Sequence, residues 1–189
     1  MQVNNQLYQE NTKKAMDMLA KEGYYFIGQT CEYAGSPMFG SLVDVPKKQK
    51  KEMPVFENTQ MGISIGMNLL GLKVCSIFPR IDFLICAVDQ LVNHLDKIKE
   101  MTHDEFTAGI IIRTQIGSKY PINGGVQHTG DYTKGLQAML KNVKVIKIKN
   151  EKEVIPSYTE AMKRAIDGKS TLIVEVPTGA FGGKRWIKI

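Results

Sequence analysis

The chain has 189 residues, of which 43% are hydrophobic and 23% are charged, and its formal net charge is +6. This composition is that of an ordinary globular protein, and the length fits one domain with a substantial core better than two. No apolar run approaches the roughly 20 residues of a membrane span, and the first ten residues lack the basic start and apolar run of a secretory signal. We therefore expect one cytoplasmic domain that does not act at a membrane.

Hydrophobic periodicity predicts helices and strands that alternate along the chain. Apolar positions recur at helical spacing from Asn5 to Glu22, and Gly23 follows as a stop signal. The segment from Cys31 to Pro46 is rich in Gly, Ser and Pro and predicts a long loop. The predicted helices are Asn5–Glu22, Glu57–Leu70, Asp82–Lys99, Asp131–Lys141 and Glu151–Asp167, and the predicted strands are Tyr24–Ile27, Met53–Phe56, Lys73–Phe78, Ala108–Arg113, Val143–Ile148 and Thr171–Val176.

This alternation predicts an α/β fold with a doubly wound, mainly parallel sheet and helices on both faces. The predicted core covers about residues 5–177, and residues 178–189 form a C-terminal tail. The tail contains the only tryptophan, Trp186, which would pack either on the domain or on a partner.

The three cysteines, Cys31, Cys75 and Cys86, are odd in number and lie in or beside apolar segments. Buried free thiols in a reducing compartment therefore fit better than a disulfide framework. Positive charge is densest at residues 47–51, which follow Pro46 and contain no aromatic residue to stack on bases. A solvated loop beside an anionic partner surface is therefore favoured over nucleic-acid binding.

Nucleotide and metal motifs are missing from the sequence. No Gly-x-Gly-x-x-Gly follows a predicted strand and no Walker sequence occurs, which argues against a Rossmann dehydrogenase or a P-loop enzyme. His94, His103 and His128 are widely spaced, and no Cys-x-x-Cys pair exists. We predict that this chain binds no metal by itself.

Glu57 lies where a short apolar strand meets a helix, a place from which a carboxyl group can face the crevice at the edge of an α/β sheet. An acid in a first turn also suits the helix dipole without any ligand. Gly62 and Gly66 follow four residues apart, and each costs up to about 1 kcal/mol relative to alanine. Their shared face would let another backbone approach closely, either across an interface or inside the domain.

His128 lies in the polar loop 123–130, after the strand that ends at Arg113 and at the same predicted edge as Glu57. A histidine there can exchange protons near neutral pH, whereas His94 on a helix and His103 in a turn have plainer explanations. His128 is therefore a candidate catalytic residue.

With these residues in order, the chain resembles the pyrimidine-binding domain of thiamine diphosphate enzymes. The similarity is greatest to the beta subunit of the 2-oxo acid dehydrogenase and transketolase superfamily, and it covers about residues 5–177. The residues that carry it are Glu57 with Gly62, Gly66, Gly71 and Leu72, then Asp82-Phe83 and residues 87–93, and finally residues 124–128.

The resemblance implies that Glu57 protonates N1′ of the aminopyrimidine ring of thiamine diphosphate, which requires a carboxyl group that holds or shares a proton. Phe83 matches the aromatic residue that stacks on this ring, although its helical spacing suits the core equally well. Pro79 and Ile81 lie where the family lines the cofactor pocket.

The resemblance also implies substrate contacts. His128 matches the histidine that faces the reacting centre and stabilises or protonates substrate oxygens. Arg80 lies in the pocket-lining segment, where it would meet an anionic group of the substrate.

The sequence departs from the family pattern in three places. The chain ends near the end of the pyrimidine domain, without the further C-terminal domain of the family. It also lacks the Gly-Asp-Gly and Asn motif that holds Mg²⁺ and the diphosphate of the cofactor. A Glu-Glu pair that often follows the first strand is replaced by Gln29-Thr30. We therefore expect Mg²⁺ to be held by a partner subunit with a pyrophosphate domain, in a heterodimer or heterotetramer.

The expected function is that of one subunit of a split thiamine diphosphate enzyme acting on a 2-oxo acid or a ketose-type sugar, as a transferase, lyase or dehydrogenase component. Two alternatives remain open: a non-catalytic interaction module that keeps the fold, and a polyanion binder driven by the lysines.

Overall fold

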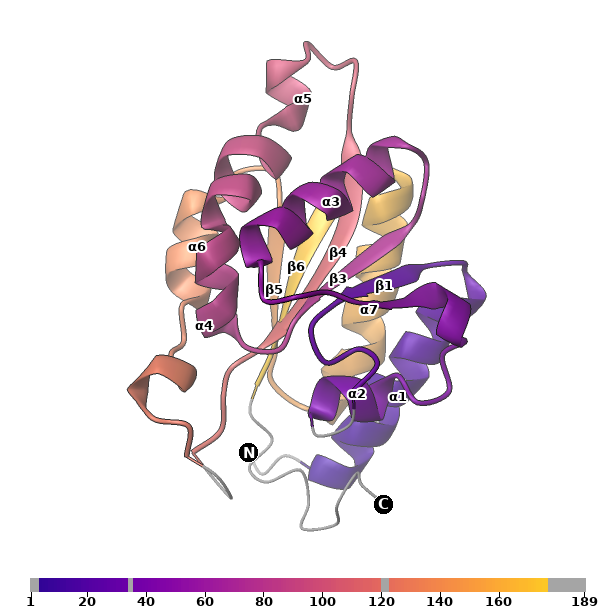
Figure 1. The fold of residues 1–189 in the computed structure, drawn as a ribbon, viewed down its shortest axis with the longest axis vertical. Helices are drawn as coiled ribbons and strands as arrows, with labels where there is room; N and C mark the ends of the chain where they lie inside the picture. Colours follow the sequence, from indigo (N-terminus) through magenta and orange to yellow (C-terminus); the bar gives the residue numbers. More distant parts are fainter. Residues whose placement is uncertain (1–3, 34–35, 120–122, 177–189) are drawn as a thin grey trace.

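The computed structural model describes residues 4–33, 36–119 and 123–176, and these residues form one six-stranded sheet with helices on both sides (Figure 1). Every neighbouring pair of strands is parallel, which confirms the predicted α/β class. Residues 178–189, with Trp186, lie outside the described residues. In the described part of the chain, no helix is both long and apolar enough to span a membrane.

The strand order is β2-β1-β3-β4-β6-β5. The chain leaves β1 to form β2 on one side and then returns to form β3 on the other, so the direction of winding reverses next to β1. In open α/β sheets, a reversal of this kind leaves a crevice outside the carboxyl ends of the strands, where ligands bind. The strands are β1 (Tyr25–Gly28), β2 (Lys50–Glu52), β3 (Val74–Phe78), β4 (Ala108–Gln115), β5 (Lys144–Ile148) and β6 (Lys169–Glu175).

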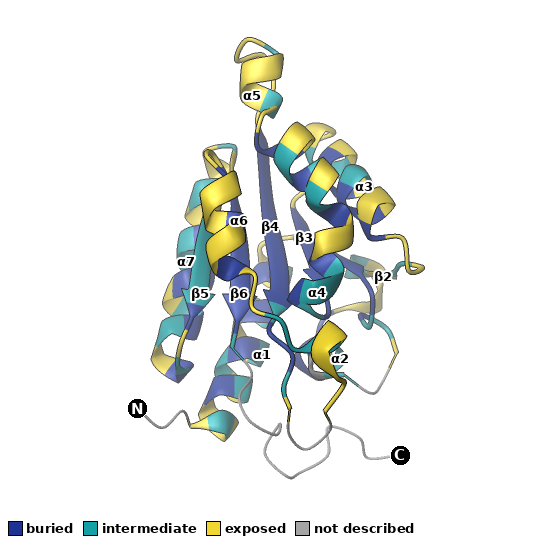
Figure 2. Ribbon diagram, turned by 90° about the vertical axis from the view of Figure 1, so that its left-hand side faces the viewer, coloured by how far each residue is buried: buried dark blue, intermediate teal, exposed yellow. Residues whose placement is uncertain are grey.

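Two helical layers cover the sheet, and successive residues of a strand point into opposite layers. In β4, Ile110 and Ile112 pack with α3, α4 and α6, whereas Ile111 packs with α1, α2 and α7. Figure 2 shows the central strands buried and the outer faces of α3 and α6 exposed. The helices are α1 (Asn5–Lys21), α2 (Pro37–Ser41), η1 (Lys47–Gln49), α3 (Glu57–Leu69), α4 (Ile81–Leu84), η2 (Ile85–Ala87), η3 (Gln90–Leu95), α5 (Ile98–Met101), η4 (Val126–His128), α6 (Thr133–Met139) and α7 (Glu151–Ile166).

The predicted strand Met53–Phe56 is wrong, because β2 ends before it, at Glu52. Pro54 has no N–H for a ladder, and β1, the partner of β2, ends at Gly28. The apolar side chains Val55 and Phe56 are instead 74% and 64% exposed. These four residues form an apolar connection at the carboxyl edge of the sheet.

The predicted continuous helix Asp82–Lys99 is also wrong, because the chain forms α4, η2, η3 and α5 in succession. In the π-helix η3, the ladder lengthens so that the Asp96 amide donates to the Leu91 carbonyl at 3.0 Å. The buried Asp96 carboxylate then accepts hydrogen bonds from the backbone amides of Lys141, Asn142 and Val143. The irregular helix therefore coincides with the carboxylate that fixes the turn before β5.

The predicted loop from Cys31 to Pro46 contains one short helix, α2. Ser36 caps it by accepting from the Phe39 amide at 3.3 Å, and Pro37 occupies its first turn. This Ser-Pro start is a recognised sequence signal for a helix, which the high content of Gly, Ser and Pro in the segment obscured.

A buried ion pair joins the ends of β4 and β6. The Arg113 guanidinium, 1% exposed, donates to both Glu175 carboxylate oxygens, at 2.9 and 3.1 Å, and to Ser41 Oγ at 2.7 Å. The Tyr158 hydroxyl donates to the same carboxylate at 2.7 Å. Burial is the largest single effect and disfavours the cation, but the surrounding acidic groups, Glu175 foremost, together hold the pKa of Arg113 above its ordinary value.

We expect Arg113→Met to lower the free energy of unfolding by about 3–5 kcal/mol, because Glu175 would remain buried without its cation. The matched control is Lys144→Met, which breaks an ion pair with Glu160 at the surface and should cost less than about 1 kcal/mol. Urea denaturation measures both values. Equal losses in the two variants would contradict the dominant role of the buried pair.

All three cysteines are free, as predicted, but Cys86 is exposed, so the expectation of burial is wrong for this residue. Cys31 and Cys75 are buried, and burial raises the pKa of the Cys75 thiol to about 12. An aromatic disulfide reagent at pH 8 should therefore label one thiol per native chain quickly and all three in denaturant. Cys86→Ser should abolish the fast phase, and a fast phase that survives would contradict this packing.

Candidate functional site

The residues singled out from the sequence follow three different strands at one edge of the sheet. Glu57 opens α3 after β2, the segment from Pro79 to Phe83 follows β3, and His128 lies in η4 after β4. Since parallel strands all end at the same edge, the fold gathers these side chains at the edge where the winding reverses.

Glu57 is 7% exposed, and its two carboxylate oxygens have different surroundings. Oε1 accepts a hydrogen bond from Gln29 Nε2 at 3.0 Å. Oε2 accepts no hydrogen bond from the described residues. It is also not fully buried, because it is missing from the fully buried polar atoms that lack a partner. The small exposed part of this side chain therefore includes Oε2.

The first turn of α3 is anchored on the sheet by Gln60. Its side-chain amide donates to Ser76 Oγ at 3.1 Å and to the Ile77 carbonyl at 2.9 Å, and both acceptors belong to β3. Because Gln60 lies one turn after Glu57, these two hydrogen bonds fix the part of the helix that carries the Glu57 carboxyl group. Glu57 is therefore held by rigid elements on both sides.

A second group of site residues contains Phe83, His128 and Arg80. The Phe83 and His128 rings meet edge to face, with centroids 5.5 Å apart and planes at 86°. Arg80 Nη1 donates to the His128 carbonyl at 3.2 Å. His128 Nδ1 lies 2.8 Å from the Gly124 carbonyl, which can only accept, so Nδ1 carries a proton and Nε2 is left for a ligand.

Two glycines let the His128 loop fold this closely. A Cβ atom on Gly117 would lie 1.7 Å from the His128 carbonyl oxygen. A Cβ atom on Gly124 would lie 2.8 Å from Arg80 Nη1 and 2.9 Å from His128 Cβ. Gly124 belongs to the motif seen in the sequence, whereas Gly117 has no sequence signal of its own.

Three other residues support the site. Pro79 and Ile81 are buried, and Ile81 is part of the core beneath the edge. Asp82 Oδ1 accepts from the Gly130 amide at 3.1 Å and so ties the end of the His128 loop to α4. Sequence reasoning gave Asp82 no role, because its contact is 48 residues away along the chain.

Among the described residues, the two groups of site residues are not joined by a hydrogen bond. Within the ranges that the structure describes, no hydrogen bond or ring contact joins Glu57 to Phe83 or His128. The two groups are connected through packing. Glu57 lies on α3, and α3 packs against η2, which directly follows the helix α4 that carries Phe83. In the same ranges, no group of three or more His, Cys, Asp or Glu residues is placed to hold a metal ion.

The glycine face of α3 is open. A Cβ atom on Gly62 would make ordinary contact with the Gln90 side chain at 3.5 Å, and one on Gly66 would meet no described atom within 4 Å. Close packing inside this chain therefore does not require either glycine.

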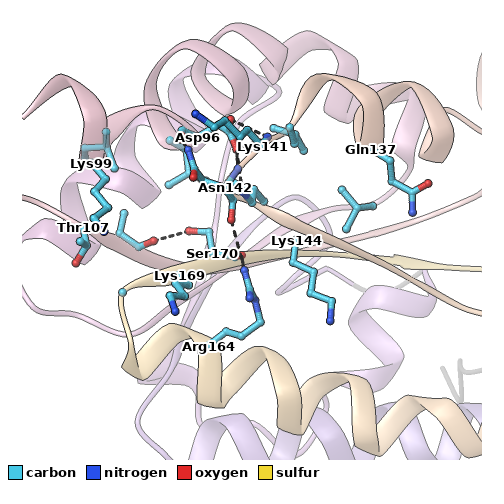
Figure 3. A pocket seen from close by; sticks show the side chains of 17 residues that line it. Asp96, Lys99, Thr107, Gln137, Lys141, Asn142, Lys144, Arg164, Lys169 and Ser170 are labelled. Atoms are coloured by element: carbon cyan, nitrogen blue, oxygen red, sulfur yellow. Dashed lines mark hydrogen bonds between the residues drawn. The ribbon is translucent and has the colours of Figure 1, made fainter. Parts of the chain in front are cut away.

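A cavity of about 560 Å³ lies at the opposite, amino edge of the sheet, and five cationic side chains line it (Figure 3). Lys99, Lys141 and Lys144 each pair with an acid, and Arg164 donates to the carbonyls of Asn142 and Ser170. Helices end at this edge, so cations there also offset helix dipoles. These contacts account for Lys99, Lys141, Lys144 and Arg164 without a polyanion.

A second cavity of similar volume, about 560 Å³, lies at the carboxyl edge, beside Gln29 and the connection into α3. Its lining includes Gln29, Glu52, Pro54 and Val55. This cavity adjoins the connection that leads into Glu57, but Glu57, Phe83 and His128 do not line it. The candidate site is placed at the carboxyl edge by the positions of these three side chains and not by the cavity.

Two curated proteins match the sequence. Over 134 residues, 71% of this chain, it is 25% identical to the 2-oxoisovalerate dehydrogenase subunit beta of Bacillus subtilis (strain 168). Over 121 residues, 62% of this chain, it is 26% identical to the pyruvate dehydrogenase E1 component subunit beta of Rhizobium meliloti (strain 1021). The resemblance to dehydrogenase beta subunits is confirmed. The matches span 37% and 26% of those proteins' own lengths, and no protein-family model matches the chain.

Solved structures agree on the fold. A split-gene transketolase, described as an inactive beta4 tetramer, superposes with a TM-score of 0.67 over 91% of this chain and 52% of its own, at 15% identity. A Mycobacterium smegmatis protein described as a thiamin diphosphate-dependent enzyme gives a TM-score of 0.60 over 86% of this chain and 29% of its own, also at 15% identity. The fold of this chain is therefore similar to part of the fold of both proteins.

Proposed function

We propose that this chain is the pyrimidine-domain subunit of a split, heteromeric thiamine diphosphate enzyme that acts on a 2-oxo acid or a ketose-type substrate. Residues 5–177 would form its single domain. The observation that carries the proposal is Glu57, held at the carboxyl edge with Oε1 bonded to Gln29 and with no partner for Oε2 among the described residues. The sequence likeness to two dehydrogenase beta subunits supports the same conclusion.

The chemistry of these residues fits the aminopyrimidine half of thiamine diphosphate. Glu57 Oε2 would hold a proton against the ring nitrogen N1′, the half-buried Phe83 ring would pack on the ring face, and Pro79 and Ile81 would back the pocket. When bound, the cofactor supplies the stabilised carbanion that carbon–carbon bond cleavage or formation next to a carbonyl requires. Because the described residues offer no metal cluster, we assign Mg²⁺ and the diphosphate to a partner.

The substrate would meet His128 and Arg80. Because Nδ1 is committed to the Gly124 carbonyl, Nε2 would be the atom of His128 that gives or takes a proton. Among the described residues, Arg80 donates one hydrogen bond, to the His128 carbonyl, and a guanidinium has five N–H donors, so others would be available for an anionic substrate group.

The partner would cover the apolar side chains that surround the site. Val55 and Phe56 precede Glu57, Ile85 follows Phe83, and Val126, 89% exposed, lies beside His128. Exposed apolar side chains that gather on a surface mark interaction sites, and the open glycine face of α3 would offer a further place for a partner to approach closely. We propose a heterodimer or heterotetramer with a pyrophosphate-domain subunit, located in the cytoplasm, where the three free cysteines would stay reduced.

In a reconstituted heteromer, we expect Glu57→Gln to lower turnover at least 10²-fold, because an amide cannot hold or transfer the proton. Glu160→Gln, on the outer surface of α7, is the matched control and should leave turnover unchanged. Steady-state assays with 2-oxo acids and ketose phosphates measure both variants. Near-normal turnover in Glu57→Gln would refute the assignment and favour a non-catalytic interaction module.

We expect His128→Ala to impair a substrate-dependent step while thiamine diphosphate still raises the melting temperature of the heteromer. His94→Ala removes an exposed imidazole from the neighbouring helix η3 and serves as the control. Single-turnover kinetics and thermal denaturation separate the two effects. Equal loss of cofactor-induced stabilisation in His128→Ala would indicate a structural role instead.

A further inference from the structure

Gly28, the residue before Gln29, is fixed by a close contact between strands β1 and β3. Gly28 ends β1 with φ +153°, and a Cβ atom there would lie 2.0 Å from the Ile77 carbonyl oxygen of β3. Only glycine fits this contact. The Gly28 carbonyl also accepts from the Met53 amide at 2.8 Å, so β1 and the connection after β2 leave the sheet together. Gln29 therefore enters the site from a fixed point.

The turn after Gln29 is held by one carboxylate. Glu52 Oε1 accepts from the Thr30 amide at 2.7 Å, and Oε2 accepts from the amides of Cys31 and Glu32 at 2.7 and 2.9 Å. Thr30 has φ +61°, a left-handed conformation that β-branched residues avoid. Three charge-assisted bonds to one carboxylate stabilise this unfavourable turn. The Glu52 amide donates in return to Glu32 Oε1 at 3.1 Å.

Gln29 transmits this arrangement to Glu57. A carboxylate oxygen only accepts, so the 3.0 Å contact identifies the Gln29 amide nitrogen as the donor. Oε1 remains an acceptor whether or not Oε2 carries a proton, so this bond persists through a cycle of protonation. A second carboxyl group in place of Gln29 would instead repel Glu57 or compete for its proton.

We propose that Gln29 and Glu52 are positioning residues that make Oε2 the proton-carrying oxygen of Glu57. Glu52 holds the turn, the turn holds Gln29, and Gln29 fixes the rotation of the Glu57 carboxyl group. This inference rests on the proposed function, and it gives a physical reason for glutamine at position 29 in place of an acid.

The test is the exchange of the thiazolium C2 proton of bound thiamine diphosphate for deuterium, followed by proton NMR in the reconstituted heteromer. We expect Gln29→Ala and Glu52→Gln each to slow exchange at least tenfold, with the cofactor dissociation constant changed less than threefold. Gln29→Glu should exchange slowly at high pH, where a carboxylate at position 29 cannot donate. As the pH falls, its carboxyl group becomes protonated and can donate, so its exchange rate should rise above that of Gln29→Ala and approach that of the unmodified protein.

Gln49→Ala is the matched control, because it removes the same amide group near the other end of β1. Gln49 Nε2 donates to the carbonyls of Ala20 and Tyr24 at 2.8 and 3.0 Å. This variant should lower the melting temperature without slowing exchange. Gln29→Ala keeps the Glu52 turn intact, so it decides the result if Glu52→Gln proves unstable.

Glu57→Gln separates the two possible failures. If it leaves exchange unchanged, the proposed function is wrong. If it stops exchange while Gln29→Ala and Glu52→Gln exchange as fast as the unmodified protein, only the positioning role is wrong.

Discussion

Parallel pairing of β1 with both β2 and β3 determines where the candidate site residues meet in this protein. Because the three strands end at one edge, the residues that follow them meet there although they are up to 50 positions apart in the sequence. The contact of Gly28 with Ile77 draws these strand ends together. Gln29 and Glu57 then lie within a hydrogen bond of each other at the winding reversal.

Buried polar groups fix the geometry at both edges of the sheet, the amino edge through Asp96 and the carboxyl edge through Arg113. Asp96 holds the turn before β5, and Arg113 with Glu175 joins the ends of β4 and β6. Each buried charge has several partners, as a low-dielectric interior requires. The His128 loop, which starts from the end of β4, is therefore supported by a network that unfolds only at considerable cost.

Much of the fold could be predicted from the sequence because its signals are local. Apolar runs such as Ala108–Arg113 identified buried strands, and the acid at the start of α3 was recognised from its neighbours. The exposed run Met53–Phe56 misled the prediction because apolarity was taken as evidence of pairing. The π-helix η3 was missed because the turn that its Asp96 carboxylate binds lies 45 residues later in the sequence.

The site was predictable in its residue types but not in its contacts. Gln29 stood out only as a departure from a family pattern, since its bond to Glu57 depends on the register of β1 against β2. Glu52 had no sequence signal, because its three partners are backbone amides on another strand's loop. Such contacts depend on tertiary structure, so they produce no characteristic spacing of residues in the sequence.

The central claim is that Glu57 forms half of a cofactor site that a partner completes. The most direct measurement is the structure of the reconstituted heteromer with thiamine diphosphate bound. The account predicts the ring nitrogen N1′ within hydrogen-bond distance of Glu57 Oε2, with Gln29 still donating to Oε1. A cofactor whose pyrimidine ring lies away from Glu57, or a Glu57 side chain turned from the interface, would contradict it.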